Sequence, residues 1–511
     1  MAEGSKQSFS RPTVVPSYRN DVSKPLRDMS PWPEQVVQEH EAAENPLIVL
    51  PHKDAPDLKV DKGTLLSQLA PSIPGPILSF NGIQFPGVAC NCAPPDTNGE
   101  VGATQYVQIA NEGYQVFDKA TGASVLGPVS IVSVWAGFGG VCQTSGHGDP
   151  VVLYDQIANR WVISQFAGSG VPTDECIAVS TSSDATGSYN RYGFHLGQNF
   201  FDYPHLGVWP DAYYMSMNVF NSSGTAYLGP QAFAFDRAKM LAGRPATFIT
   251  FPALGSNQSP FLPADLDGST LPPNGAPNSF VQFPDSNKYN TYHFHADFGG
   301  SGSTFTLFGS PNAASFTQLC PGKRNCIPQR HASSSNKLDA IADRLMFRLA
   351  YRNFGNHEAI VGNFTVSVSG VAGIRWFELR GLTSGPVKVF QEGTYSPDST
   401  NRWMASVAQD GQGNMAVGFS ASDATIFPQI RYAGRLKKDP LGTLAQGEAH
   451  LFDGSGAQIN TGNRWGDYSD LTVDPVDDST FWYTNEYYDT TSSFNWHTRI
   501  GSFKIASGAA N

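Results

Sequence analysis

The stretch that decides the fold is RWMASVAQDGQGNMAVGFS, residues 402–420. It opens on a charged residue, continues as a short apolar strand, turns through Asp, Gly and Asn, and ends in a second apolar strand. Two apolar runs flanking such a turn are typical of a β-hairpin, because Gly and Asn readily adopt the backbone angles of tight turns. The stretch therefore predicts one hairpin of an antiparallel sheet.

The same pattern recurs along the chain. Further copies are DTNGEVGATQYVQIANEGYQVFD (96–118), GDPVVLYDQIANRWVISQF (148–166), DYPHLGVWPDAYYMSMNVF (202–220), DRLMFRLAYRNFGNHEAIVGNF (343–364), RWGDYSDLTVDPVDDSTFWYTNEY (464–487) and a weaker one, DLDGSTLPPNGAPNSFVQFPD (265–285). Repeated hairpins are typical of a β-propeller, whose closed ring protects the edges of its small sheets. We expect an all-β protein, a β-propeller most simply of seven four-stranded blades. A β-sandwich and two separate β domains are the alternatives.

The composition agrees with this fold class. Of 511 residues, 51 are Gly and 36 are Pro, while only 15% are charged, which favours short strands and tight turns over long surface helices. The first 75 residues are rich in Pro and charge and show no strand pattern. We expect residues 1–75 to form an irregular N-terminal segment, as a linker, pro-segment or strap, and residues 76–508 to form the propeller.

Charge and hydropathy exclude two classes of partner. The net charge of −11 argues against a broad phosphate-binding surface, so we expect no nucleic-acid partner. No run of 18 or more apolar residues is present, so the sequence predicts no membrane span. We expect a monomer.

The six cysteines form an even set. Cys320 and Cys326 bracket a loop short enough for a disulfide, Cys142 and Cys176 would form a second pair, and Cys90 and Cys92 a third. Zinc binding is the alternative, although the cysteines lack a matching pair with nearby histidines. Because disulfides persist in oxidising compartments, we expect a secreted or periplasmic protein.

Two short segments carry a family resemblance. SSDATGSY, residues 182–189, resembles the Asp-box turn of sialidase-like propellers, and SASDATIFP, residues 420–428, resembles a degraded second copy. Over residues 77–508 the chain is similar to secreted bacterial proteins of the broad sialidase-like propeller superfamily. This resemblance implies an arginine cluster for a substrate carboxylate. The Arg-Ile-Pro motif of true sialidases is absent, so activity on sialic acid is not implied.

The repeats also predict where a site should lie. In a propeller, the innermost strand of each blade lines the central channel, and the loops that lead into these strands form a funnel. The charged residues that open the repeats should therefore converge. They are Asp96, Asp149, Asp202, Asp343, Arg344, Arg402, Arg464 and Asp467.

Cleavage of a glycosidic bond needs two carboxylates, or a base beside a neutralised uronate. The catalytic candidates are Asp149, Asp202, His205, Asp467 and Glu486, the last because Glu486–Tyr487 resembles the Tyr–Glu pair of sialidases. The substrate-binding candidates are Arg344, Arg402, Arg464, Tyr203 and Trp465. In the structural alternative, the arginines pair with aspartates of neighbouring blades and the aromatic residues fill the space between blades.

We expect no cofactor, with calcium at Asp-rich turns such as residues 474–478 as an open alternative. The sequence favours a secreted carbohydrate-active enzyme, a glycoside hydrolase or polysaccharide lyase, acting on a polysaccharide or glycoconjugate that is acidic or stacks on aromatic rings. The alternative is a non-catalytic propeller that binds a glycan or a protein.

Overall fold

A computed structural model describes residues 11–30, 40–41, 48, 52–61, 73–87, 92–168, 173–331, 333, 336–459 and 463–505. Its strands pair into antiparallel groups of four that follow one another along the chain. The first group is β7 (Asn98–Val101), β8 (Gln105–Ala110), β9 (Gly113–Asp118) and β10 (Ser124–Ser130). The second is β11 (Gly146–Asp155), β12 (Arg160–Ala167), β13 (Asp174–Ser180) and β14 (Tyr189–His195). The third is β15 (Phe200–Val208), β16 (Tyr213–Phe220), β17 (Tyr227–Phe235) and β18 (Thr247–Thr250).

The next two groups share one sheet, because β19 and β25 pair in parallel. They are β19 (Phe261–Asp267), β20 (Asn278–Gln282), β21 (Thr291–His295) and β22 (Thr304–Gly309), and then β25 (Met346–Asn353), β26 (Glu358–Val368), β27 (Val371–Arg380) and β28 (Lys388–Tyr395). The sixth group is β29 (Asn401–Gln409), β30 (Met415–Ser422), β31 (Gln429–Arg435) and β32 (Glu448–Asp453). The last is β33 (Asp470–Val473), β34 (Phe481–Tyr488), β35 (Trp496–Phe503) and β5 (Leu78–Gln84).

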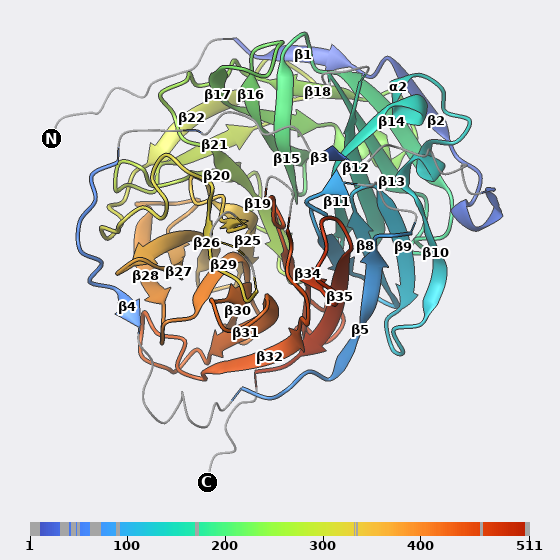
Figure 1. The fold of residues 1–511 in the computed structure, drawn as a ribbon. Helices are drawn as coiled ribbons and strands as arrows, with labels where there is room; N and C mark the ends of the chain where they lie inside the picture. Colours follow the sequence, from blue (N-terminus) through green and yellow to red (C-terminus); the bar gives the residue numbers. More distant parts are fainter. Residues whose placement is uncertain are drawn as a thin grey trace, which may run out of the picture.

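These groups surround a common axis (Figure 1). The ring closes where β5, from the N-terminal part of the chain, pairs with β35 from the C-terminal part. The all-β class and the β-propeller fold are therefore confirmed. The seven-blade count stays a prediction, which this grouping supports.

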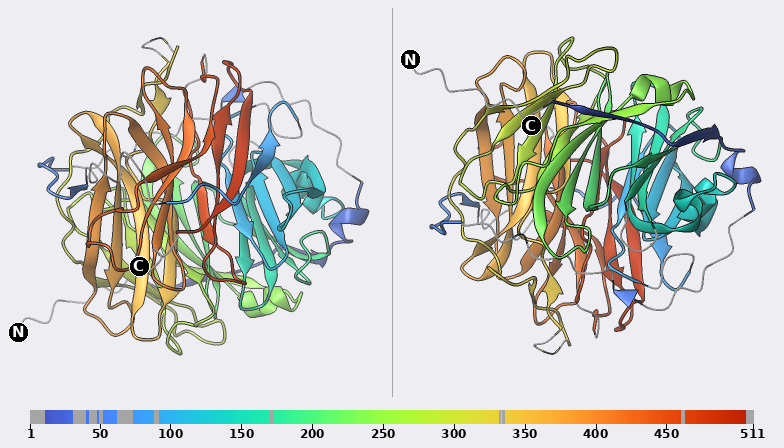
Figure 2. Two further views of the ribbon diagram at one scale, coloured as in Figure 1. Left: turned by 90° about the horizontal axis from the view of Figure 1, so that it is seen from below. Right: turned by 90° about the horizontal axis from the view of Figure 1, so that it is seen from above.

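The N-terminal part of the chain contributes short strands to the outer edges of the groups. β1 (Thr13–Pro16) pairs with β18, β2 (Arg19–Val22) pairs with β14, and β4 (Val60–Asp61) pairs with β28. Figure 2 shows the dark-blue strands crossing the outside of the green and teal groups. Covering a sheet edge protects backbone groups that would otherwise pair with another chain. The domain boundary at residue 75 stays a prediction.

The remaining described elements are short. They are the helical turns η1 (Leu26–Asp28), η2 (Ile131–Trp135), α2 (Val141–Thr144) and α3 (Arg237–Leu241), and the paired strands β3 (His40–Glu41) with β6 (Cys92–Ala93) and β23 (Asn325–Ile327) with β24 (Leu338–Asp339). None of the described helices is long and apolar enough to cross a membrane.

The hairpin in residues 402–420 shows why the repeats fold in this way. In the turn between β29 and β30, Asp410 Oδ1 accepts hydrogen bonds from the backbone N–H groups of Gln412 and Asn414, both at 2.9 Å. Gly413 has φ 85°, a conformation that suits a residue without a Cβ. The local sequence thus fixes the turn, and the alternating apolar residues on either side of it pack between neighbouring sheets.

Two of the predicted disulfides are confirmed. Cys142 joins Cys176, which links α2 to β13, and Cys320 joins Cys326. Cys90 lies outside the described residues, so the third pairing stays a prediction.

The two Asp-box-like segments both form turns stabilised by an aspartate. Asp184 Oδ1 accepts from Thr186 N at 2.9 Å, and Asp423 Oδ1 accepts from Thr425 N at 2.7 Å. The first turn joins the third and fourth strands of its group, whereas the second joins the second and third strands. The two turns therefore do not occupy equivalent positions in their blades.

Candidate functional site

The candidate site lies where the innermost strands begin. The first strands of neighbouring groups contact one another along the axis. Near the start of β11, β15, β25 and β29 the pairing register is irregular. Such bulges bend a strand and redirect its side chains, and they are common next to active sites. We call this end of the axis the mouth.

Three aspartates at the mouth adopt the left-handed backbone conformation. Asp96, Asp149 and Asp467 have φ of 49°, 41° and 51°. Asp visits this region more readily than most residues, because its short side chain can form local hydrogen bonds. The repeat openings therefore combine a special backbone shape with a carboxylate.

Four aspartates form the centre of the mouth, and they interact through hydrogen bonds and charge. Asp96 shares a side-chain hydrogen bond with Asp149, and Asp149 Oδ2 accepts from Tyr203 N at 3.2 Å. Burial and the charges of Asp467 and Asp149 hold the pKa of Asp96 well above its usual range. Burial and the charges of Asp202 and Asp467 do the same to the pKa of Asp149. Burial also raises the pKa of Asp202, against the opposing charge of Arg344.

Two of the predicted arginines, Arg344 and Arg464, border these carboxylates. Arg344 Nε donates to Asp343 Oδ1 at 2.8 Å, and its guanidinium carbon lies 4.8 Å from the centroid of the Tyr203 ring. Arg464 donates to Asp467 Oδ2. Its Nε is 3.7 Å from Asp339 Oδ2. The predicted arginines at 344 and 464 are thus at the mouth, and each already faces a carboxylate.

Sequence reasoning missed two members of this cluster. Arg324 lies in the loop closed by the Cys320–Cys326 disulfide, and Asp339 lies in β24. Arg324 Nη1 is 3.6 Å from Asp339 Oδ2, and its charge also lowers the pKa of Asp343, although burial opposes this. The loop inserts between two repeats, so the repeat pattern could not locate it. Its sequence, PGKRN between two cysteines, was the available signal.

An aromatic layer lies beneath the carboxylates. The His205 ring stacks on Phe347 at 4.8 Å and meets Tyr203 and Tyr468 edge-on at 4.0 and 4.9 Å. Burial and the charge of Arg344 hold the pKa of His205 well below its usual range. His205 is therefore a neutral side chain in a fully buried layer, next to the carboxylates and closed to solvent.

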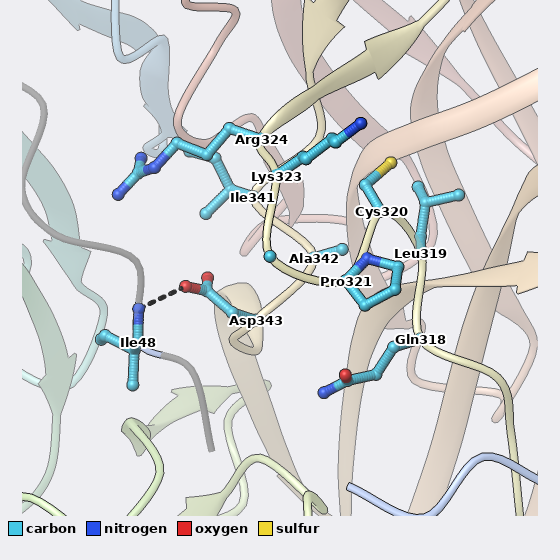
Figure 3. Close-up of a pocket in the computed structure, with 11 residues that line it drawn as sticks. Ile48, Gln318, Leu319, Cys320, Pro321, Lys323, Arg324, Ile341, Ala342 and Asp343 are labelled. Atoms are coloured by element: carbon cyan, nitrogen blue, oxygen red, sulfur yellow. Dashed lines mark hydrogen bonds between the residues drawn. The ribbon is translucent and has the colours of Figure 1, made fainter. Parts of the chain in front are cut away.

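A small pocket adjoins the mouth (Figure 3). It holds about 40 Å³ and lies between the disulfide loop, Asp343 and Ile48. Ile48 N donates to Asp343 Oδ2 at 3.2 Å, so a residue of the N-terminal part of the chain touches the cluster. A cavity of this size accommodates water rather than a sugar ring.

Three of the predicted site residues lie elsewhere. Arg402 donates to Glu448 at 2.7 Å and to Asp398 at 2.9 Å, within its own part of the ring. Trp465 is fully buried against Trp403, and its indole N–H donates to Ser420 Oγ at 3.1 Å. These contacts match the structural alternative for both residues.

Glu486 lies behind the mouth rather than in it. It is fully buried, and its Oε2 accepts from Gly466 N at 2.9 Å. Tyr487 points to the opposite face of β34, where its ring lies 4.4 Å from that of Phe452. Successive residues of a strand face opposite sides, so the two side chains cannot form the pair that the sequence suggested.

The described residues offer no arrangement for a metal ion, since they contain no suitable group of three or more His, Cys, Asp or Glu side chains. His293 Nε2 donates a hydrogen bond to the Leu382 carbonyl at 2.8 Å. The calcium alternative stays untested.

Searches for known families and for curated relatives find no match. Solved structures do match at low identity. A protein of unknown function from Dyadobacter fermentans is 9% identical, with a TM-score of 0.38 over 71% of this chain and 95% of the other. An endosialidase of phage phi92 is 10% identical, with a TM-score of 0.38 over 82% and 68%. An endo-arabinase from Bacteroides thetaiotaomicron is 13% identical, with a TM-score of 0.28 over 56% and 94%. Likenesses at this level carry no information about activity.

Proposed function

We propose that this protein is a secreted or periplasmic carbohydrate-active enzyme that hydrolyses a glycosidic bond at the mouth of the propeller. The observation that carries this proposal is the group of interacting carboxylates in which burial and neighbouring charges hold the pKa of Asp149 well above its usual range. Glycoside hydrolysis uses one protonated carboxyl group as the acid and a second carboxylate as the base or nucleophile. The two disulfides support the location.

In this proposal, Asp149 donates the proton to the leaving oxygen. Burial and the charges of Asp202 and Asp467 favour its protonated form, whereas its hydrogen bond with Asp96 favours the ionised form. Asp467, which is ion-paired with Arg464, is the partner carboxylate that activates water or attacks the sugar carbon. Asp202, beside Arg344, orients the sugar.

Hydrolysis is favoured over β-elimination. A lyase must neutralise the uronate carboxylate of its substrate before a base removes the adjacent proton. Arg344 and Arg464 already face protein carboxylates, so neither presents an open guanidinium fork. This arrangement supports a hydrolase.

The test is an activity screen of the purified full chain against neutral, acidic and amino polysaccharides. We expect new reducing ends without unsaturated products, and a loss of about 100-fold to 10,000-fold in Asp149→Asn, the effect typical of a general acid. Asp398→Asn is the matched control, because it removes an arginine-paired carboxylate outside the mouth. Glycan binding without any product would instead establish the non-catalytic binding propeller.

A further inference from the structure

Residues 52–61 run along the outside of the ring and end in β4 (Figure 1). We call this segment the strap. Its last residues pair with the outer edge of β28, where Thr394 N donates to the Lys59 carbonyl at 2.8 Å. Asp57 Oδ1 lies 2.7 Å from Arg375 Nη2, and the two side chains are 4% and 0% exposed. Because arginine keeps its charge at every ordinary pH, we expect this pair to anchor the strap in both mildly acidic and mildly alkaline solution.

The other end of the strap is held by His52, whose side chain is fully buried. Its Nδ1 lies 2.8 Å from the carbonyl oxygen of Asp285, and its Nε2 lies 3.1 Å from the carbonyl oxygen of Phe316. The His52 ring also stacks on the Phe316 ring, with the centroids 4.2 Å apart. Both ring nitrogens therefore face atoms that can only accept a hydrogen bond.

A neutral imidazole does not suit this arrangement, because only one of its two nitrogens carries a hydrogen atom. The other nitrogen would point a lone pair at a carbonyl oxygen and would stay unpaired in a buried place, which costs free energy. An imidazolium has two N–H donors, one for each carbonyl oxygen. The geometry around His52 therefore fits the protonated ring.

The charged groups around His52 favour the same state. On the strap itself, Asp54 Oδ1 lies 3.8 Å from His52 Nε2. In the turn after β20, burial raises the pKa of the Asp285 carboxyl, and the charge of His52 opposes this. The guanidinium carbon of Arg375 lies 6.0 Å from the centroid of the Phe316 ring, but this arginine is already paired on the strap. Two carboxyl groups thus act in favour of the imidazolium.

The strap also contacts residues beside the mouth. Gln318 N donates to Asp54 Oδ1 at 2.9 Å, and Gln318 lines the small pocket next to the mouth (Figure 3). Ile48 lines the same pocket, and its N–H donates to the Asp343 carboxylate. Residues that precede and follow His52 in the sequence therefore contact the pocket or its lining.

We propose that His52 is a proton-dependent clasp, which holds the first half of the strap and Ile48 beside the mouth in acidic solution and releases them as the pH rises. Docking favours the imidazolium, so it is strongest below about pH 6.5, where a free histidine is already protonated, and weakens once the docked ring loses its proton. The Asp57–Arg375 pair keeps the second half of the strap in place. Release removes part of the lining of the pocket, so the shape of the mouth depends on pH.

The test is amide hydrogen exchange of the wild-type full chain at about pH 5.5 and about pH 8, on either side of the range in which histidine titrates. Rates are corrected for the intrinsic effect of pH on exchange. The backbone N–H of Ala55 donates to the Phe316 carbonyl, and a peptide that contains Ala55 should be protected roughly tenfold more at the lower pH, because hydrogen bonds to charged groups contribute more than neutral ones. A peptide that contains Thr394 should be protected equally at both pH values, because it reports on the anchored end.

His52→Gln cannot titrate, so it should lose the pH dependence at Ala55. His450→Gln is the matched control and should retain it, because His450 lies on β32 and pairs with Asp453 there. Equal protection of the Ala55 peptide at both pH values in the wild type would overturn the inference, even if His52→Gln fails to fold. A pH dependence that persists in His52→Gln, or equal losses at Ala55 and Thr394, would also overturn it. These outcomes do not depend on whether the mouth cuts a glycan.

Discussion

Two clusters of arginine and aspartate side chains lie along the propeller axis, and they differ in whether their carboxylate oxygens are paired. We call the cluster of Arg348, Asp265 and Asp267 the hub. At the hub, Arg348 donates to Asp265 at 2.7 Å and to Asp267 at 2.6 Å. Val208 N donates to the remaining oxygen of Asp265 at 2.8 Å, so both carboxylates have all their oxygens bonded. At the mouth, Asp96 and Asp467 each leave one oxygen without a donor among the described residues.

The difference separates a structural cluster from a candidate site. At the hub one arginine is fully enclosed, and the two aspartates that it bonds have every oxygen paired. At the mouth Asp96 is buried while Asp149 and Asp202 are half-buried, and burial together with neighbouring charges holds the pKa of Asp96 and of Asp149 well above the usual range. Functional sites commonly tolerate such local instability, which the rest of the fold offsets.

The largest expected effect is on the hub. Arg348→Met should lower the free energy of unfolding by about 3–5 kcal/mol, because it leaves Asp265 and Asp267 buried without their cation. Urea denaturation followed by fluorescence measures the change. A loss below about 1 kcal/mol would show that the two clusters do not differ in this way.

The next effect is a pH dependence near the mouth. Burial raises the pKa of Glu112 to about 7. The backbone N–H of its neighbour Asn111 donates to the Pro95 carbonyl, next to Asp96, at 2.8 Å. The folded protein keeps a proton that the unfolded chain releases above its ordinary pKa of 4.5. The free energy of unfolding should therefore fall as pH rises from 4.5 to 7, by up to about 1.4 kcal/mol per pH unit.

Glu112→Gln is the control for this slope, since it cannot titrate. Chemical denaturation of wild type and variant across this pH range tests the prediction. Parallel curves for the two proteins would assign the slope to other groups.

A smaller effect is expected for a mouth carboxylate. Asp96→Asn should change the free energy of unfolding by no more than about 1 kcal/mol, and in the stabilising direction above neutral pH. The physical reason is that the amide has no charge to be desolvated or repelled by Asp149 and Asp467. Asp267→Asn at the hub is the matched comparison, and it should destabilise the protein because Arg348 loses one of its two ion pairs. Equal losses in both variants would contradict the contrast.

The smallest effect is expected at Asp398. Its side chain is 54% exposed, and Arg402 also pairs with Glu448. Asp398→Asn should therefore change the unfolding free energy by about 0.2–1 kcal/mol. Thermal melting compared with wild type is sufficient, and a drop as large as that of Arg348→Met would show that exposed and buried pairs contribute alike.

Much of the architecture was readable from the sequence because it depends on local rules. The turn at Asp410 and Gly413 uses backbone hydrogen bonds that the residue types favour, and the same logic holds in each repeat. The convergence of Asp149, Asp202 and Asp467 also followed from the repeats, since equivalent residues of a ring must face the same end of the axis.

The positions of the three predicted arginines, Arg344, Arg402 and Arg464, could not be predicted in the same way. In the sixth group the left-handed position is Met404, with φ 52°, whereas in the last group it is Asp467. Arg402 stands two residues before that position and pairs with Glu448, while Arg464 stands three residues before it and pairs with Asp467. A shift of one residue along a strand turns a side chain to the opposite face. Aligning Arg402–Trp403 with Arg464–Trp465 therefore did not predict that Arg464 reaches the mouth and Arg402 does not.

By itself, the sequence determined the hairpins and the charged character of the repeat openings, because turns and strand alternation depend on neighbouring residues. Only the tertiary structure decided which charges meet. It brought Arg324 and Asp339 to the mouth from an insertion, and it enclosed Trp465, His205 and Glu486. It also paired every oxygen of Asp265 and Asp267 while leaving Asp96 Oδ1 and Asp467 Oδ1 without a donor among the described residues. Pairing and desolvation are set by residues distant in the chain, and these contacts exist only after the ring has closed.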